Sequence, residues 1–209
     1  FLDIWMNYYT SFISPKDIVI MYRNSSGFNL EEYLQVRGWG DVRVTVVPTS
    51  TDQMVNAAYF LEVQTDLLKN SDVVLYSDID EIIFHKDLLK VLNTFTAPYL
   101  TTTGFEIIQN SLKESSLDTN SEILAQRKYG KFSEWYDKSY ILREVVYWEA
   151  GKHSKNLIKN TLEGLYLVHL NKVDINLLQE INSQTAHYYS TGAYHNRIKD
   201  RSDLIANYQ

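Results

Sequence analysis

The sequence has no cysteine, three prolines and eight glycines in 209 residues. Without cysteine, a disulfide framework, a thiolate metal site and a cysteine nucleophile are excluded, and the composition suits a reducing compartment. No stretch approaches the roughly 20 consecutive apolar residues that a membrane-spanning helix requires. A chain of this length buries about 70 % of its unfolded surface, so it can form a core without covalent staples.

The sequence has a modest excess of negative charge. The sequence has 20 basic and 26 acidic residues, a net charge of −6. This balance argues against nucleic acid or an anionic membrane surface as a partner held by general electrostatic attraction. The apolar segment Phe1–Phe12 lacks the basic start and the small-residue cleavage site of a signal peptide. We therefore expect a soluble, cytoplasmic protein without a membrane span, folded as one domain over residues 1–209.

Apolar runs and helical patterns alternate in the first part of the chain. Strands are expected at Asp17–Tyr22, Val42–Val47 and Asp72–Tyr76. Helices are expected at Phe1–Ile13, Leu30–Arg37 and Asp52–Lys69. Continuous apolar strands are typical of a sheet that is covered on both faces. Their alternation with helices predicts an α/β fold with a mainly parallel sheet flanked by helices.

The second part of the chain is less regular. We expect helices at Lys86–Thr94 and Asp174–Ile181, and strands at Thr101–Ile108, Ser139–Arg143 and Leu165–Leu170. The polar segment Asn110–Lys131 has no firm period and predicts a loop with a helix at Glu122–Arg127. No repeat, low-complexity tract or linker interrupts the chain, in agreement with a single domain.

A group of carboxylates follows the third expected strand. The apolar run Val73–Tyr76 leads directly into Ser77-Asp78-Ile79-Asp80-Glu81. In open α/β sheets, ligands bind beyond the carboxyl ends of the strands. Adjacent carboxylates repel one another unless a cation or solvent relieves them, and oxygen ligands favour Mg²⁺ or Mn²⁺ shared with phosphates. The pattern thus predicts a metal site; the alternative is a solvated acidic turn.

Two other classes of site contain closely spaced carboxylates. An EF-hand loop starting at Asp78 needs glycine at its sixth position, where Ile83 stands, so this class is excluded. A phosphohydrolase with an aspartyl nucleophile also has Asp-x-Asp after a buried strand. That class usually has the motif at its first strand, with Thr or Val where this chain has Ile82. It stays as an alternative enzyme class.

The same residues resemble a known family. Asp78-Ile79-Asp80 after an apolar strand resembles the DxD motif of GT-A-fold glycosyltransferases, and S-D-I-D-E-I-I resembles a family-2-like bacterial and viral group of them. Further segments similar to that group follow in the same order: Trp5–Tyr9, Ile18–Ser26, Gln53 with Asn56–Tyr59, Lys138–Arg143, Gly151–His153 and Leu167–Leu170. The order of these motifs, rather than any one of them, carries the resemblance.

The resemblance implies a fold, a reaction and a cofactor. It implies a GT-A-like, Rossmann-like domain with a nucleotide-sugar half over about 1–100 and an acceptor half over about 101–209. The reaction would move a sugar from a nucleotide-sugar donor, expected to be a UDP-sugar, to a glycan or glycoprotein acceptor. Mn²⁺ or Mg²⁺ would be held by Asp80 with Asp78, where a divalent ion neutralises charge on the leaving diphosphate. His169 or His153 would add a nitrogen ligand.

The resemblance also suggests contacts for the substrates. The candidate substrate-binding residues are Arg23, Gln53, Ser77, Asp78, Lys152, Trp135 and Trp148. Arg23 stands where the family usually has an aspartate that helps to recognise the base, so the base remains open. The aromatic residues can instead fill the core.

The sequence indicates the general base, which would deprotonate the acceptor, less clearly than the metal ligands. The Glu-Asp pair that supplies it in many inverting members is absent from this chain. Glu149 and Asp137 are candidates by location, because an inverting transfer requires deprotonation of the acceptor hydroxyl. If neither acts, a retaining mechanism becomes the alternative. A carbohydrate-binding module that keeps the fold without turnover is the non-enzyme alternative.

Overall fold

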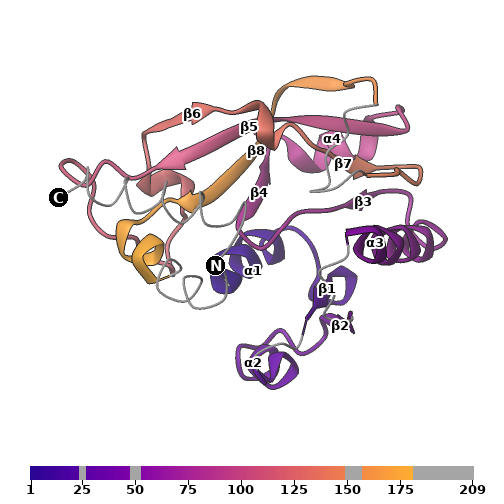
Figure 1. Ribbon diagram of the computed structural model, residues 1–209, viewed down its shortest axis with the longest axis horizontal. Coiled ribbons are helices and arrows are strands. Elements are labelled where there is room, and N and C mark those ends of the chain that lie inside the picture. Colours follow the sequence, from indigo (N-terminus) through magenta and orange to yellow (C-terminus); the bar gives the residue numbers. More distant parts are fainter. Residues whose placement is uncertain (24–26, 48–52, 149–156, 181–209) are drawn as a thin grey trace.

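The computed structural model describes residues 1–23, 27–47, 53–148 and 157–180, with the side chains of 53–56 left out (Figure 1). The α-helices are α1 (Leu2–Thr10), α2 (Leu30–Val36), α3 (Gln53–Leu68), α4 (Leu88–Thr94) and a helical segment over 175–180. The 3-10 helices are η1 (Pro15–Asp17), η2 (Leu124–Gln126) and η3 (Glu134–Tyr136). None of the helices in these ranges is long and apolar enough to cross a membrane.

The strands are β1 (Val19–Tyr22), β2 (Arg43–Val46), β3 (Val74–Leu75), β4 (Glu81–Phe84), β5 (Tyr99–Ile108), β6 (Gly130–Phe132), β7 (Ser139–Leu142) and β8 (Thr161–Lys172). Each strand expected from the sequence is present near its expected position. Strands β4 and β6 were not expected, and the helix expected at Glu122–Arg127 is only the 3-10 turn η2. Strand β4 was missed because its first residue belongs to the acidic motif, which has the composition of a turn.

The protein is a mixed α/β structure with two sheets. Strands β1 and β2 form a parallel pair, and a six-stranded sheet has the order β3-β7-β5-β8-β4, with β6 attached to β5. In the larger sheet β5 and β8 are parallel, whereas the β3–β7, β4–β8, β5–β6 and β5–β7 pairs are antiparallel. The expectation of a mainly parallel sheet is therefore wrong for the described residues. Parallel neighbours need a crossover connection, usually a helix, and loops with 3-10 turns link β5, β6 and β7 instead.

Helix α1 lies between the two sheets (Figure 1). Ile4 packs with Ile82 and Val168 of the larger sheet. Met6 and Tyr9 pack instead with the group around β1 and α2. The helix is therefore buried on two sides, which accounts for the apolar and aromatic composition at the start of the chain.

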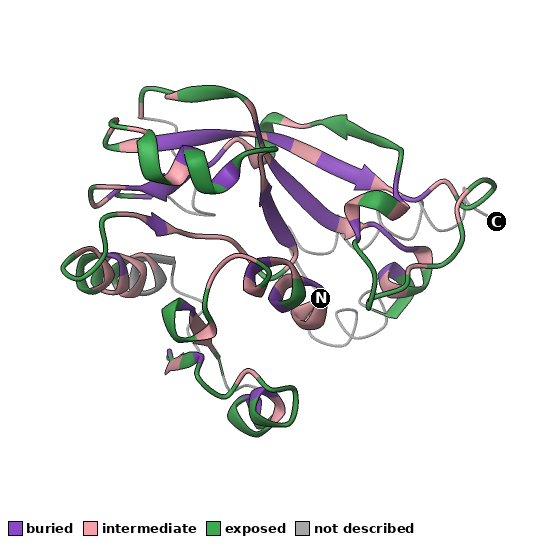
Figure 2. Ribbon diagram, turned by 180° about the vertical axis from the view of Figure 1, so that it is seen from behind, coloured by how far each residue is buried: buried purple, intermediate pink, exposed green. Residues whose placement is uncertain are grey.

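The main core lies under the centre of the larger sheet, where the strands are the most buried elements (Figure 2). Ile83, Tyr140, Ile141, Leu165 and Leu167 are fully buried there. Helix α4 covers this core with Leu88 and Val91. The strands of both halves of the chain contribute to it, since β3 pairs with β7 and β4 with β8.

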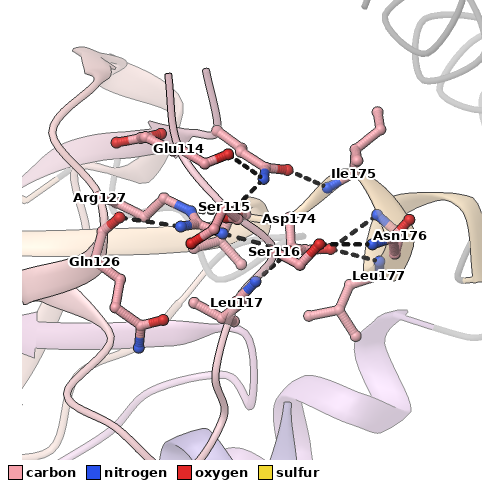
Figure 3. A network of polar contacts seen from close by, with 12 residues as sticks. Glu114, Ser115, Ser116, Leu117, Gln126, Arg127, Asp174, Ile175, Asn176 and Leu177 are labelled. Atoms are coloured by element: carbon pink, nitrogen blue, oxygen red, sulfur yellow. Dashed lines mark hydrogen bonds and ion pairs between the residues drawn. The ribbon is translucent and has the colours of Figure 1, made fainter. Parts of the chain in front are cut away.

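A polar network fastens residues 110–127 to the end of β8 (Figure 3). Arg127 and Asp174 form a buried ion pair of 3.3 Å, and Arg127 Nε donates to the Val173 carbonyl oxygen at 2.5 Å. Asp174 also accepts from the backbone N–H groups of Leu117 and Asn176, both at 2.8 Å or less. The segment that the sequence predicts as a loop is thus held by specific contacts.

Candidate functional site

The acidic motif crosses the larger sheet from one end to the other. Strand β3 is the first strand of the sheet order and β4 is the last. At the start of the crossing, Tyr76 N–H donates to the Tyr140 carbonyl oxygen of β7, at 2.8 Å. At its end, Leu170 N–H of β8 donates to the Asp80 carbonyl oxygen, also at 2.8 Å. The segment therefore brings Asp78 and Asp80 over side chains that come from the middle strands.

The first of these side chains is Lys138, which directly precedes β7. Its ammonium lies 2.7 Å from Glu81 Oε1 and 3.7 Å from Asp78 Oδ2. The Lys138 and Glu81 side chains are only 7 % and 2 % exposed. Burial and the charge of Asp78 raise the pKa of Glu81, and Lys138 opposes them. Asp78 Oδ1 accepts a hydrogen bond from the Tyr76 hydroxyl at 3.1 Å.

The second is His169 on β8, which is paired with Glu81 on β4 and with Glu106 on β5. His169 Nε2 lies 3.4 Å from Asp80 Oδ2, and Nδ1 lies 3.5 Å from Glu106 Oε1. The Tyr136 ring stacks on the imidazole with 4.1 Å between ring centroids. Tyr136 reaches this position because η3 packs directly on Gly104 of β5, where a Cβ would lie 2.2 Å from the Ser133 carbonyl oxygen.

The charges in this cluster support one another. Burial favours the neutral imidazole, but the neighbouring carboxylates of Asp80 and Glu106 and the surrounding negative charge raise the pKa of His169 to about 9. Although burial opposes ionisation of Glu106, the nearby imidazole of His169 and the hydrogen bond from Lys172 lower its pKa to about 2. For Asp80, too, burial opposes ionisation, and the hydrogen bond and charge of His169 lower the pKa. These shifts favour the ionised forms of His169, Glu106 and Asp80.

A cavity of about 1070 Å³ adjoins the cluster. Its walls come from α1, β1, α3 and the segment from Val73 to Ile79. Ser77 and Asp78 lie on the wall, and Ser77 Oγ accepts from Trp5 Nε1 at 2.8 Å. Arg23, at the end of β1, is close enough for its charge to act on the Tyr76 hydroxyl. Asp78 belongs to both the cavity and the charged cluster.

The structure brings together part of the predicted site. Asp80 contacts His169, and Ser77 and Asp78 of the same segment lie on the cavity wall, with Arg23 close to Tyr76. Trp148 instead lies in the core, 8 % exposed, where its Nε1 donates to the Ser139 carbonyl oxygen. The alternative given for the aromatic residues, that they fill the core, holds for this one.

Trp135 on η3 is 71 % exposed, so its ring is open to solvent. Asp137, a candidate general base, accepts from the Gly104 N–H through Oδ1 and from Lys159 Nζ through Oδ2, both at 2.8 Å. Glu149, Lys152 and His153 lie outside the described residues, as does the side chain of Gln53.

Glu106 belongs to the cluster but is not marked by any motif of the sequence, whereas Glu81 and Lys138 are marked only as parts of motifs. Glu81 could have been selected as a site residue, since it extends the acidic motif and is followed directly by an apolar run. Lys138 could also have been selected from the sequence, because it is a lysine directly before the apolar strand Ser139–Leu142. Glu106 could not be selected in this way. It lies within an expected strand, and only the pairing of β5 with β8 brings it next to His169.

In the described ranges, no group of three or more His, Cys, Asp or Glu side chains converges as a preformed metal site.

Comparison with models of known protein families, with curated proteins and with solved structures finds no match to this chain.

Proposed function

We propose that this protein is a metal-dependent glycosyltransferase that moves a sugar from a nucleotide-sugar donor to a glycan acceptor. The observation that carries the proposal is the position of the Asp78–Asp80 segment: Asp80 lies against His169, and Asp78 and Ile79 form part of the wall of the cavity. The cavity of about 1070 Å³ is large enough for a nucleotide sugar. The DxD-like motif of the sequence supports the same conclusion.

The residues fit a divalent ion by their chemistry. Carboxylate oxygen and imidazole nitrogen suit Mn²⁺. Asp80 Oδ2 and His169 Nε2 face each other at 3.4 Å. Asp80 and His169 would hold the ion, with Asp78 as the third ligand. The bound ion would act as a Lewis acid toward the leaving diphosphate.

The protein's own groups would bind and orient the donor. Apolar and aromatic side chains in the cavity, among them Trp5 and Tyr22, would enclose the nucleoside. Ser77 and Asp78 stand where its ribose or diphosphate would approach. Asp137 is bound through both oxygens, which disfavours it as the base that deprotonates the acceptor. Glu149 or a retaining mechanism is therefore proposed for that step.

The fold is proposed to be a variant of the GT-A arrangement. Helix α2 connects the parallel strands β1 and β2, and α3 leads into β3 and the acidic motif. This order of alternating strands and helices supports the proposal of a GT-A-like fold.

The proposal is tested by donor binding and turnover. Purified protein is screened by thermal shift with UDP-, GDP- and dTDP-sugars, with and without Mn²⁺, and donor hydrolysis is measured for any hit. Stabilisation by one nucleotide sugar that requires Mn²⁺ is expected. Stabilisation by free glycans alone would identify a carbohydrate-binding module, and phosphate release from small phosphomonoesters would identify a phosphohydrolase.

Asp80→Asn is expected to lower metal-dependent turnover by about 100-fold or more, because the metal supplies several kcal/mol of transition-state stabilisation. The matched control is Asp41→Asn, which removes the same charge at an exposed position away from the cavity. Wild-type turnover in Asp80→Asn would refute the metal assignment.

A further inference from the structure

Glu106 is a buried carboxylate that the proposed reaction does not yet use. Its side chain is 6 % exposed and lies next to His169 in the parallel register of β5 and β8. Residues paired in this way point to the same face of a sheet, so the two side chains meet without any loop between them. Burial of a carboxylate is costly unless it is paired, which makes its partners informative.

The two oxygens of Glu106 have different partners. Oε2 binds Lys172 Nζ at 2.8 Å, and Oε1 lies 3.5 Å from His169 Nδ1. Lys172 therefore anchors the carboxylate and offsets its charge, while the other oxygen faces the imidazole. Within the described part of the chain, His169 Nδ1 is buried and forms no well-aligned hydrogen bond. Glu106 is the acceptor placed to take one.

The His169 ring is restrained from three directions. Asp80 lies at Nε2, Glu106 lies at Nδ1, and the Tyr136 ring stacks on the imidazole with an angle of 17° between the planes. Rotation of the ring by half a turn would exchange its nitrogen atoms for carbon atoms and lose both carboxylate contacts. The arrangement therefore fixes which nitrogen faces Asp80.

From these contacts we infer that Glu106, anchored by Lys172, is a positioning residue that holds His169 with Nε2 directed at Asp80 and at a divalent cation bound there. The inference rests on the proposed function for the role of that cation. A histidine ligand commonly donates its second ring N–H to a carboxylate, and loss of such a partner lowers metal affinity by about 10–100-fold.

The test compares Glu106→Gln with Glu163→Gln, which makes the same change at an exposed position of β8, the strand that carries His169. In metal-free protein with ¹⁵N-labelled histidine, we expect a downfield, exchange-protected His169 Nδ1 proton. It should move upfield and lose protection in Glu106→Gln and remain in Glu163→Gln. Binding of Mn²⁺ alone, followed by electron paramagnetic resonance, should weaken about 10-fold or more in Glu106→Gln only.

An unchanged Nδ1 proton or unchanged Mn²⁺ affinity in Glu106→Gln would overturn the inference. If this variant does not fold, Lys172→Met, which keeps the carboxylate but removes its anchor, is expected to shift both signals in the same direction. If wild-type protein binds no Mn²⁺, the proposed metal function fails, and the Nδ1 proton by itself decides whether Glu106 positions the ring.

Discussion

The buried pair of Lys138 and Glu81 has the strongest energetic consequence at the scale of single residues. Its Nζ–Oε1 distance is 2.7 Å, and neither side chain has appreciable contact with solvent. Such a pair gives little net stability relative to apolar residues, but loss of one partner leaves a buried charge unpaired. Lys138 thus opposes the rise in the pKa of Glu81 that burial and Asp78 cause at the start of β4.

Lys138→Met is expected to lower the free energy of unfolding by about 3–5 kcal/mol, because Glu81 loses its counter-charge. Urea denaturation followed by circular dichroism measures this loss. The double variant Lys138→Met with Glu81→Gln should recover part of it, since the unpaired charge is removed. Equal stability of wild type and Lys138→Met would show that solvent reaches Glu81.

At the scale of elements, α1 protects an edge of the larger sheet. Strand β4 is the last strand in the sheet order, so its outer peptide groups have no neighbouring strand in the described part of the chain. The Tyr8 hydroxyl donates to the Ile83 carbonyl oxygen at 2.8 Å, and the Ile83 N–H donates to the Tyr9 hydroxyl at 2.9 Å. Covering an edge in this way prevents pairing with another chain.

Tyr9→Phe is expected to destabilise the protein by about 1–3 kcal/mol, because the buried Ile83 N–H loses its acceptor. Thermal unfolding of the purified variant is the measurement. Tyr22→Phe is the matched control, since the Tyr22 hydroxyl bonds the Phe28 carbonyl oxygen at an exposed position. Similar losses in the two variants would argue that the hydroxyl group of Tyr9 has no special role at the edge.

At the scale of the whole molecule, contacts distant in sequence hold the irregular second part of the chain to the larger sheet. The Arg127–Asp174 pair fastens residues 110–127 to the end of β8, on the strand that carries His169 (Figure 3). Gln109 extends the network, since its side chain accepts from the Ile175 N–H at 2.8 Å and donates to the Ser115 carbonyl oxygen at 3.0 Å. The network closes the irregular part of the chain onto the sheet.

Arg127→Met is expected to loosen residues 110–127, because the buried Asp174 carboxylate loses its charged partner. Limited proteolysis under native conditions should cut within this segment several times faster than in wild type. Arg43→Met is the control, since Arg43 pairs with Asp66 at the surface with 3.7 Å between the charged groups. Unchanged cleavage would mean that the backbone contacts of Asp174 suffice.

The sequence by itself determined most elements and the position of the acidic motif. Apolar runs and helical spacing are local properties, so β1, β2 and α1 to α4 could be predicted at nearly their observed positions. Asp78 and Asp80 could be predicted because they follow an apolar strand directly. The antiparallel arrangement of the larger sheet was not predictable in the same way, since pairing is selected by contacts between distant segments.

Tertiary structure alone decided what surrounds the carboxylates. Lys138 reaches Glu81 from 57 residues away, and Lys172 reaches Glu106 from 66 residues away. No local pattern marks such partners, because a buried charge is tolerated only where another chain segment supplies its counter-charge. Trp148 illustrates the same limit, since its place in the core depends on packing against distant residues. The sequence therefore defines the acidic motif, and the pairing of β4, β8 and β5 defines its environment.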